Sequence, residues 1–134
     1  MSALYDSGRE GFLDGSIDWD TDDIRAILID TGAYTVDLAT HNMLDDVAAG
    51  SRIAVSGALA GKTVTAGVAD ANDVTFTAVT GTTVEAIILY KHTGTESTSR
   101  LIAYINSGTG LPVTPNTGDI TVTWSSGANK IFKL

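Results

Sequence analysis

The sequence predicts an all-β protein, a single domain built as a β-sandwich or a rolled antiparallel sheet of about seven or eight short strands. Three observations predict this fold class. Short segments rich in β-branched residues recur along the chain, turn-forming Gly, Asn, Asp and Thr separate them, and 134 residues is the usual size of one domain. One or two short helices are expected in the N-terminal third.

The first predicted strand comprises residues 24–29, an apolar run that ends at Asp30, a residue typical of turns. The segment 34–50 carries Leu44 and Val47 at helical spacing and ends on a glycine, which is a helix stop signal. This segment therefore predicts one short helix at most.

Three further strands are predicted at residues 52–56, 62–66 and 73–79, with residues 69–72 as a hairpin connection between the second and the third. The run 83–90 is the most apolar segment of the chain. We expect it to be the central strand, because a strand that is covered on both faces loses its alternation of apolar and polar residues.

The C-terminal part predicts the remaining strands. Residues 101–106 form one strand, whereas residues 107–118 are expected to be a loop or a sheet edge, because their two prolines cannot donate hydrogen bonds to a neighbouring strand. Residues 119–125 alternate apolar side chains with threonines, the clearest strand pattern of the chain. Residues 131–134 are expected to form a last short strand.

The formal net charge of −8 is concentrated near the N-terminus. Residues 1–46 hold 11 Asp or Glu against two Arg, whereas the remainder holds five acidic and six basic residues. Because nucleic-acid affinity comes largely from Lys and Arg, this balance disfavours direct binding of DNA or RNA. The chain has no Cys and no apolar run of about 18 residues, so we expect no disulfide, no membrane partner and assembly in a reducing cytoplasm.

The sequence contains no catalytic motif, which predicts a non-enzymatic protein without a cofactor. His41 and His92 stand among polar residues, with neither a Cys nor a second His at ligand spacing, and we expect both to be exposed. No GxSxG elbow, no phosphate-binding GxxxxGK[ST] loop and no GxGxxG turn is present.

An acidic cluster, DGSIDWDTDD, is the segment closest to a metal-binding pattern. Asp18, Asp20 and Asp22 alternate as at the start of a calcium loop, but Asp23 stands where an EF-hand needs Gly and Ile29 where it needs Glu. These three aspartates are candidates for a looser cation site. The alternative is a solvated acidic turn, or an electrostatic contact with a basic partner.

We expect residues 1–23 to form an acidic arm that contacts a partner, ahead of a β-sandwich domain at residues 24–134. Apolar and aromatic side chains within the arm are the candidates for this contact: Tyr5, Phe12, Ile17 and Trp19. Trp19 stands among aspartates, so it either plugs the sheet edge or anchors a subunit contact, as Trp often does at interfaces.

The order of these segments resembles a family of small virion proteins of tailed bacteriophages, often described as head decoration (cement) or minor capsid proteins. The matching segments are YDSGREGFLDGSIDW, IRAILID, YTVDLATHNMLDDV, GKTVT with DANDVTFTAV, VEAIILYKHTG with RLIAYI, and ITVTWSSGANKIFKL. They cover nearly the whole chain. The resemblance implies a β-rich structural protein without an active site, bound in many copies to the major capsid protein on the outer surface of the head, which it stabilises.

Two other functions fit the same sequence. A tail or baseplate component would also use a β-sandwich that assembles into rings or trimers. A carbohydrate-binding or adhesin module would use exposed Trp19 or Tyr34 to stack on sugar rings. For a virion protein we expect a homo-oligomer, and a trimer would match the local three-fold axes of a capsid.

Overall fold

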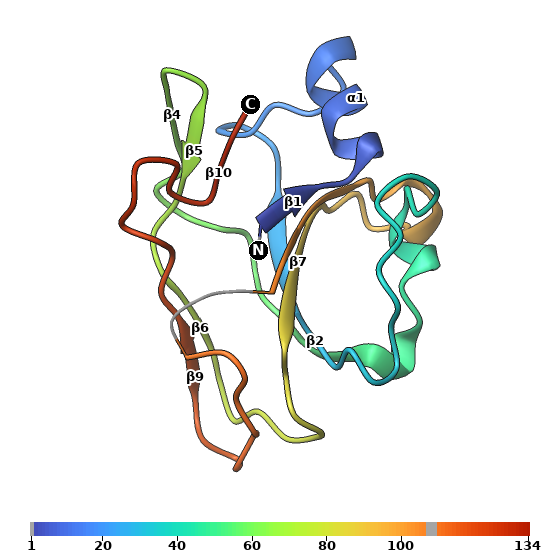
Figure 1. Ribbon diagram of the computed structural model, residues 1–134, viewed down its shortest axis with the longest axis vertical. Helices are drawn as coiled ribbons and strands as arrows, with labels where there is room; N and C mark the ends of the chain where they lie inside the picture. The colour runs from blue at the N-terminus through green and yellow to red at the C-terminus, as the bar shows by residue number, and fades with distance from the viewer. Residues whose placement is uncertain (1, 107–109) are drawn as a thin grey trace.

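The computed structural model describes residues 2–106 and 110–134. Within this part, the chain forms ten β-strands, one α-helix and three short 3₁₀ helices, and its strands belong to three antiparallel sheets (Figure 1). The predicted class, a small all-β sandwich-like domain, is confirmed. No helix of the described residues is long and apolar enough to cross a membrane.

The largest sheet has five strands in the order β1-β8-β7-β2-β3. The segment predicted to be the central strand forms β7, and it lies in the middle of this sheet between β8 and β2. The strands of this sheet are β1 (Ser2–Leu4), β8 (Leu101–Ile105), β7 (Ala86–Lys91), β2 (Ile24–Ile29) and β3 (Arg52–Val55).

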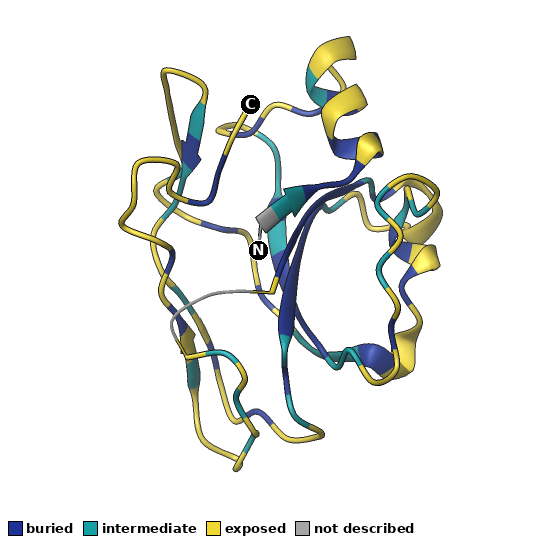
Figure 2. Cartoon of the chain, viewed as in Figure 1, coloured by how far each residue is buried: buried dark blue, intermediate teal, exposed yellow. Residues whose placement is uncertain are grey.

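Strands β2, β7 and β8 are buried on both faces (Figure 2). Because successive side chains of a strand point to opposite faces, Ala26 and Leu28 enter a larger core on one side of the sheet, and Ile27 and Ile29 enter a smaller core on the other. Such double burial explains why these strands read as continuous apolar runs.

Short strands cover the face of the larger core. Side chains from them, among them Phe76, Val122 and Phe132, pack into this core with the five-stranded sheet. A three-stranded sheet contains β4 (Thr63–Thr65), β5 (Val68–Asp70) and β10 (Phe132–Lys133), and a two-stranded ribbon contains β6 (Val74–Phe76) and β9 (Ile120–Val122).

The smaller core is covered by residues 30–51, which run largely as irregular chain. Tyr34, Leu44 and Val47 from this segment pack against the sheet. The helix predicted within residues 34–50 is replaced by two 3₁₀ turns. Leu44 begins the first turn and Val47 directly follows it, and both side chains are buried in the smaller core. The three 3₁₀ helices are η1 (Leu44–Asp46), η2 (Ala49–Ser51) and, after β7, η3 (Glu96–Thr98).

The N-terminal segment differs from the expected arm. Its first residues form β1, which pairs with β8, and the next form helix α1 (Asp6–Asp14). A short helix in the N-terminal third was predicted, but not at these residues. The helix packs on β8 through Ser7 and Gly8, and Gly11 is buried against Ile17 and Arg100. A Cβ at Gly8 would lie 2.6 Å from the carbonyl oxygen of Ile102, so the close approach requires glycine there.

The connection predicted at residues 69–72 is also corrected. Val68–Asp70 is strand β5, and β4 turns into it through Ala66 and Gly67, both with positive φ (52° and 78°). Two residues with positive φ are typical of a tight hairpin turn, but Ala is uncommon at such a position, so the turn was not predicted. Residues 110–118 form no strand, although Val113 pairs with Val84 in an isolated bridge; residues 107–109 lie outside the described part.

Candidate functional site

The four residues expected to contact a partner lie inside the fold. Tyr5 is 0% exposed, and Ile17 and Trp19 are each 4% exposed. Phe12 is partly buried and packs against Phe132, with ring centroids 5.7 Å apart. Tyr5, Ile17 and Trp19 thus fill the two cores of the chain itself, and only Phe12 keeps part of its surface exposed.

Trp19 joins the acidic turn to the sheet that covers the larger core. Its ring is nearly perpendicular to the Phe132 ring, with the ring centroids 5.2 Å apart. Its indole N–H donates to the carbonyl oxygen of Asp70 at 3.1 Å. The sequence left two roles open for this Trp, to plug the sheet edge or to anchor a subunit contact; in the structure it is buried and holds the turn against β5 and β10.

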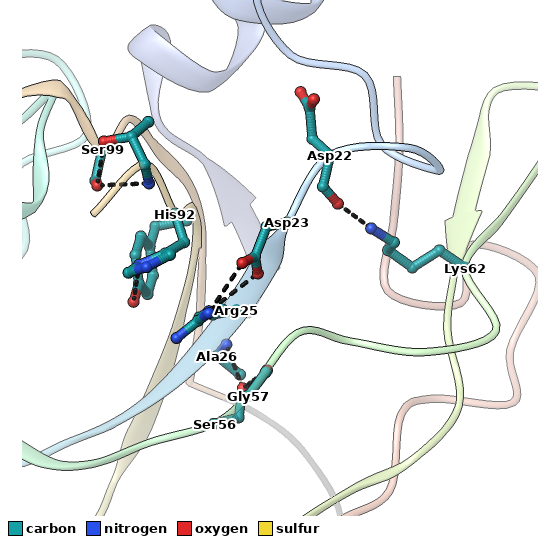
Figure 3. Close-up of polar contacts among 11 residues, drawn as sticks. Asp22, Asp23, Arg25, Ala26, Ser56, Gly57, Lys62, His92 and Ser99 are labelled. Atoms are coloured by element: carbon teal, nitrogen blue, oxygen red, sulfur yellow. Dashed lines mark hydrogen bonds and ion pairs between the residues drawn. The ribbon is translucent and has the colours of Figure 1, made fainter. Parts of the chain in front are cut away.

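The acidic turn is organised around Asp22, whose contact with Lys62 is shown in Figure 3. Its carboxylate accepts the backbone N–H of Asp18 at 2.8 Å and lies 3.0 Å from the Lys91 ammonium group. The Lys62 ammonium group donates to the Asp22 carbonyl oxygen. Asp22 is thus engaged by two lysines that come from distant parts of the chain.

Asp23 and Arg25 form a two-point ion pair beside this turn (Figure 3). The guanidinium donates to both carboxylate oxygens, at 3.0 and 2.9 Å, and this contact lowers the pKa of Asp23. The Asp23 carbonyl oxygen accepts the backbone N–H of His92 at 2.8 Å. These contacts fix the entry of β2 against the end of β7.

Asp18 and Asp20 interact with each other rather than with a shared centre. A hydrogen bond between their carboxyl groups lowers the pKa of Asp18 and raises that of Asp20, as expected when two acids share a proton. Across residues 2–106 and 110–134, no three His, Cys, Asp or Glu side chains lie together as a metal ion would require. The candidate cation set of Asp18, Asp20 and Asp22 is therefore not assembled.

A chain of hydrogen bonds that the sequence did not indicate links helix α1 to the layer at residues 30–51. The Tyr5 and Tyr34 hydroxyls are 2.8 Å apart, and the Tyr34 hydroxyl lies 2.8 Å from His41 Nδ1. Burial raises the pKa of both tyrosines. The two histidines were expected to be exposed; instead both are half-buried beside tyrosines, with His92 Nδ1 3.4 Å from the Tyr90 hydroxyl.

The Ser99 hydroxyl takes part in the local loop and makes no hydrogen bond to His92 among the described residues. It donates to the carbonyl oxygen of Thr95 at 2.8 Å and accepts the backbone N–H of Thr93 at 3.2 Å. His92 turns its Nδ1 to Tyr90 instead (Figure 3). Ser99 and His92 thus each bond to other residues, Ser99 to Thr93 and Thr95 and His92 to Tyr90, rather than to each other.

A groove of about 880 Å³ opens between the β1 edge of the large sheet and strands β9 and β10. Apolar side chains from several elements line it, among them Ile87, Ile105, Trp124 and Phe132, and Lys130 and Lys133 also border it. All of these residues except Lys130 belong to segments that were predicted to be strands. The groove itself could not be predicted, because it depends on how far apart the sheets are held.

Comparison with known proteins assigns no family to the chain. No family model matches it, and no curated protein is similar to it in sequence. Function must therefore be argued from the residues, the fold and the surfaces.

Proposed function

We propose that the protein is a non-enzymatic structural protein of a tailed-phage virion, a head decoration protein that binds the major capsid lattice and stabilises the head. The observation that carries this proposal is the resemblance described above, which extends over nearly the whole chain. In this proposal the protein sits on the outer surface of the capsid as a homo-oligomer, with a trimer as the expected state.

The architecture supports a structural role. A five-stranded sheet whose three inner strands are buried on both faces is a rigid scaffold, and every buried side-chain N or O atom of the described residues has a hydrogen-bond partner. Rigid scaffolds present loops and turns in fixed positions, as binding to a repeated lattice requires.

The charge distribution supports one side of the molecule for the proposed contact with the capsid. Residues 30–51, which cover the smaller core, contain four Asp and neither Lys nor Arg. Helix α1 adjoins this segment, since the Asp6 backbone N–H donates to the Leu38 carbonyl oxygen at 2.8 Å, and it adds exposed Glu10. We infer that this acidic side, residues 30–51 together with α1, faces a basic region of the major capsid protein.

The proposal is tested by co-sedimentation of the purified protein with phage heads that lack it, together with a measurement of the temperature at which packaged DNA is released. We expect saturable binding at a fixed ratio to the major capsid protein and DNA release at a higher temperature. Absence of binding to heads would refute decoration, and labelling the protein on intact virions would then test the tail or baseplate alternative.

A matched pair of variants tests the acidic side. Glu10→Gln/Asp45→Asn removes two exposed negative charges there, whereas Thr63→Lys/Thr65→Lys changes the net charge equally on exposed β4, in the opposite layer. We expect the first variant to weaken binding to heads several-fold, at about 0.5–1 kcal/mol per charge, and the second to leave it unchanged. Equal effects would refute the assignment of this side.

The carbohydrate-binding alternative loses its basis in the structure. It required Trp19 or Tyr34 to be exposed for stacking on sugar rings, and these side chains are only 4% and 5% exposed.

A further inference from the structure

The groove is bordered by three strands, β1, β9 and β10, one from each of the three sheets. Each is the last strand of its sheet and has one hydrogen-bonded neighbouring strand within residues 2–106 and 110–134: β8 for β1, β6 for β9 and β5 for β10. An edge strand presents backbone N–H and C=O groups that no neighbouring strand pairs. The groove is therefore bordered by strand edges that can accept a further strand.

The lining of the groove is suited to apolar side chains. Leu111, Val113 and Ile120 line the groove with partly exposed side chains, whereas Ile87, Ile105 and Phe132, which also line it, are buried. The Trp124 indole N–H donates to the Asn72 carbonyl oxygen at 2.9 Å, which holds this ring in the wall of the groove with only 8% of the residue exposed. A volume of about 880 Å³ leaves room for several side chains of an extended segment.

The charged residues along the groove make its border basic, although the whole chain has a formal net charge of −8. Lys130 and Lys133 are exposed and form no ion pair with any described residue. Arg9 is paired with Asp6, and the acid that lines the groove, Asp119, accepts the backbone N–H of Ala78 at 3.0 Å. The two lysines are therefore available to an acidic ligand.

We propose that this groove binds an extended segment of a partner protein in which apolar and acidic residues alternate, and that the segment adds as a strand to the exposed edges. Side chains of a strand point alternately to its two faces, so one set enters the apolar groove and the other faces outward to Lys130 and Lys133. Pairing of main-chain groups supplies affinity, and the pocket and the charges supply specificity.

This inference does not depend on the proposed virion role. Peptide binding is measured on the isolated protein, whereas decoration is measured on phage heads, so either result can fail while the other stands.

The test titrates the intact ¹⁵N-labelled protein with a capped peptide of alternating Val and Asp and follows its amide resonances. Three comparisons accompany it: a peptide of alternating Val and Lys, the acidic peptide with its central Val replaced by Pro, and the acidic peptide added to two variants. Lys130→Gln/Lys133→Gln removes the two groove charges, and Thr63→Glu/Thr65→Glu changes the net charge equally on β4, which does not line the groove.

We expect the acidic peptide to shift the amides of β1, β9 and β10, with an affinity at least about threefold weaker in the lysine variant and unchanged in the β4 variant. The Pro-containing peptide should bind more weakly, because proline cannot donate to a strand edge. No shift at millimolar peptide would overturn the proposal. Equal binding of the basic peptide would overturn the acidic preference, and equal binding of the Pro-containing peptide would overturn strand addition.

Discussion

Gly8 is the point at which helix α1 comes closest to the sheet. A methyl group there would lie 2.6 Å from the carbonyl oxygen and 2.8 Å from the Cα of Ile102, and both are backbone atoms of β8 that cannot turn away. We expect Gly8→Ala to force the helix outward and to lower the free energy of unfolding by about 1–3 kcal/mol. Chemical denaturation monitored by circular dichroism measures this change.

The control for this substitution is Gly50→Ala, because Gly50 is exposed and a Cβ there meets nothing within 4 Å. Its free energy of unfolding should stay within about 0.5 kcal/mol of the wild type. If both variants lost equal stability, the close packing of α1 on β8 would not be the cause.

Tyr5 depends on Tyr34 for its hydrogen bond, since its hydroxyl is fully buried and lies 2.8 Å from the Tyr34 hydroxyl. Tyr34→Phe leaves this buried hydroxyl without its partner, so we expect a loss of about 1–3 kcal/mol in the free energy of unfolding. The double variant Tyr5→Phe/Tyr34→Phe should lose less than the sum of the two single variants, with a coupling of at least about 0.5 kcal/mol. Strictly additive losses in denaturation experiments would contradict the paired geometry.

Strands β7 and β4 represent the two extremes of burial among the elements. Leu89 of β7 is 0% exposed between two neighbouring strands, whereas Val64 of β4 is 55% exposed on an edge. We expect Leu89→Ala to lower the free energy of unfolding by about 2–5 kcal/mol, because it leaves a cavity in the larger core. Val64→Ala should change it by less than about 0.5 kcal/mol, and thermal or urea unfolding of both variants checks this contrast.

The same difference in burial explains which elements could be predicted from the sequence. Three segments are so apolar that their burial on both faces follows from their composition. They are residues 24–29, 83–90 and 101–106, and they form β2, β7 and β8. Helix α1 was not predicted at its residues because its buried face consists of Ser7, Gly8 and Gly11, which pack by being small and leave no apolar periodicity.

The surfaces were predicted less well than the strands, because exposure depends on contacts between distant residues. Trp19 and Tyr5 occur in an acidic segment, yet Phe132 covers one and Tyr34 the other, from 113 and 29 positions further along the chain. By its spacing in the sequence Asp22 resembles a cation ligand, but in the fold it is engaged by Lys91 and Lys62. Local spacing contains none of this information.

At the scale of the whole molecule, the two layers that cover the five-stranded sheet differ in charge. Residues 30–51 carry four Asp and no Lys or Arg, whereas residues 58–82 and 110–134 together hold three acidic and three basic residues. One side of the molecule is thus acidic, and the other is close to neutral with lysines at its groove. A protein with such opposed sides can meet two different partner surfaces, a basic one and an acidic-apolar one, without competition between them.

The smaller core gives the whole molecule a defined response to alkali, because it contains all four tyrosines of the chain: Tyr5, Tyr34, Tyr90 and Tyr104. Burial is the main cause that raises the pKa of each above its usual value of 10. Above about pH 10 the unfolded chain loses tyrosine protons that the folded chain keeps, so the free energy of unfolding falls as pH rises. Below that pH this contribution is fully present.

We therefore expect little tyrosinate to form in the folded protein near pH 10, and a cooperative rise in tyrosinate absorbance only when the tertiary circular dichroism signal is lost. The variant Tyr5→Phe/Tyr34→Phe should show a shallower fall of the free energy of unfolding with pH, since fewer protons are linked to unfolding. A gradual rise in tyrosinate absorbance around pH 10, with the tertiary signal intact, would mean that the layer of residues 30–51 opens to solvent without unfolding of the sheet.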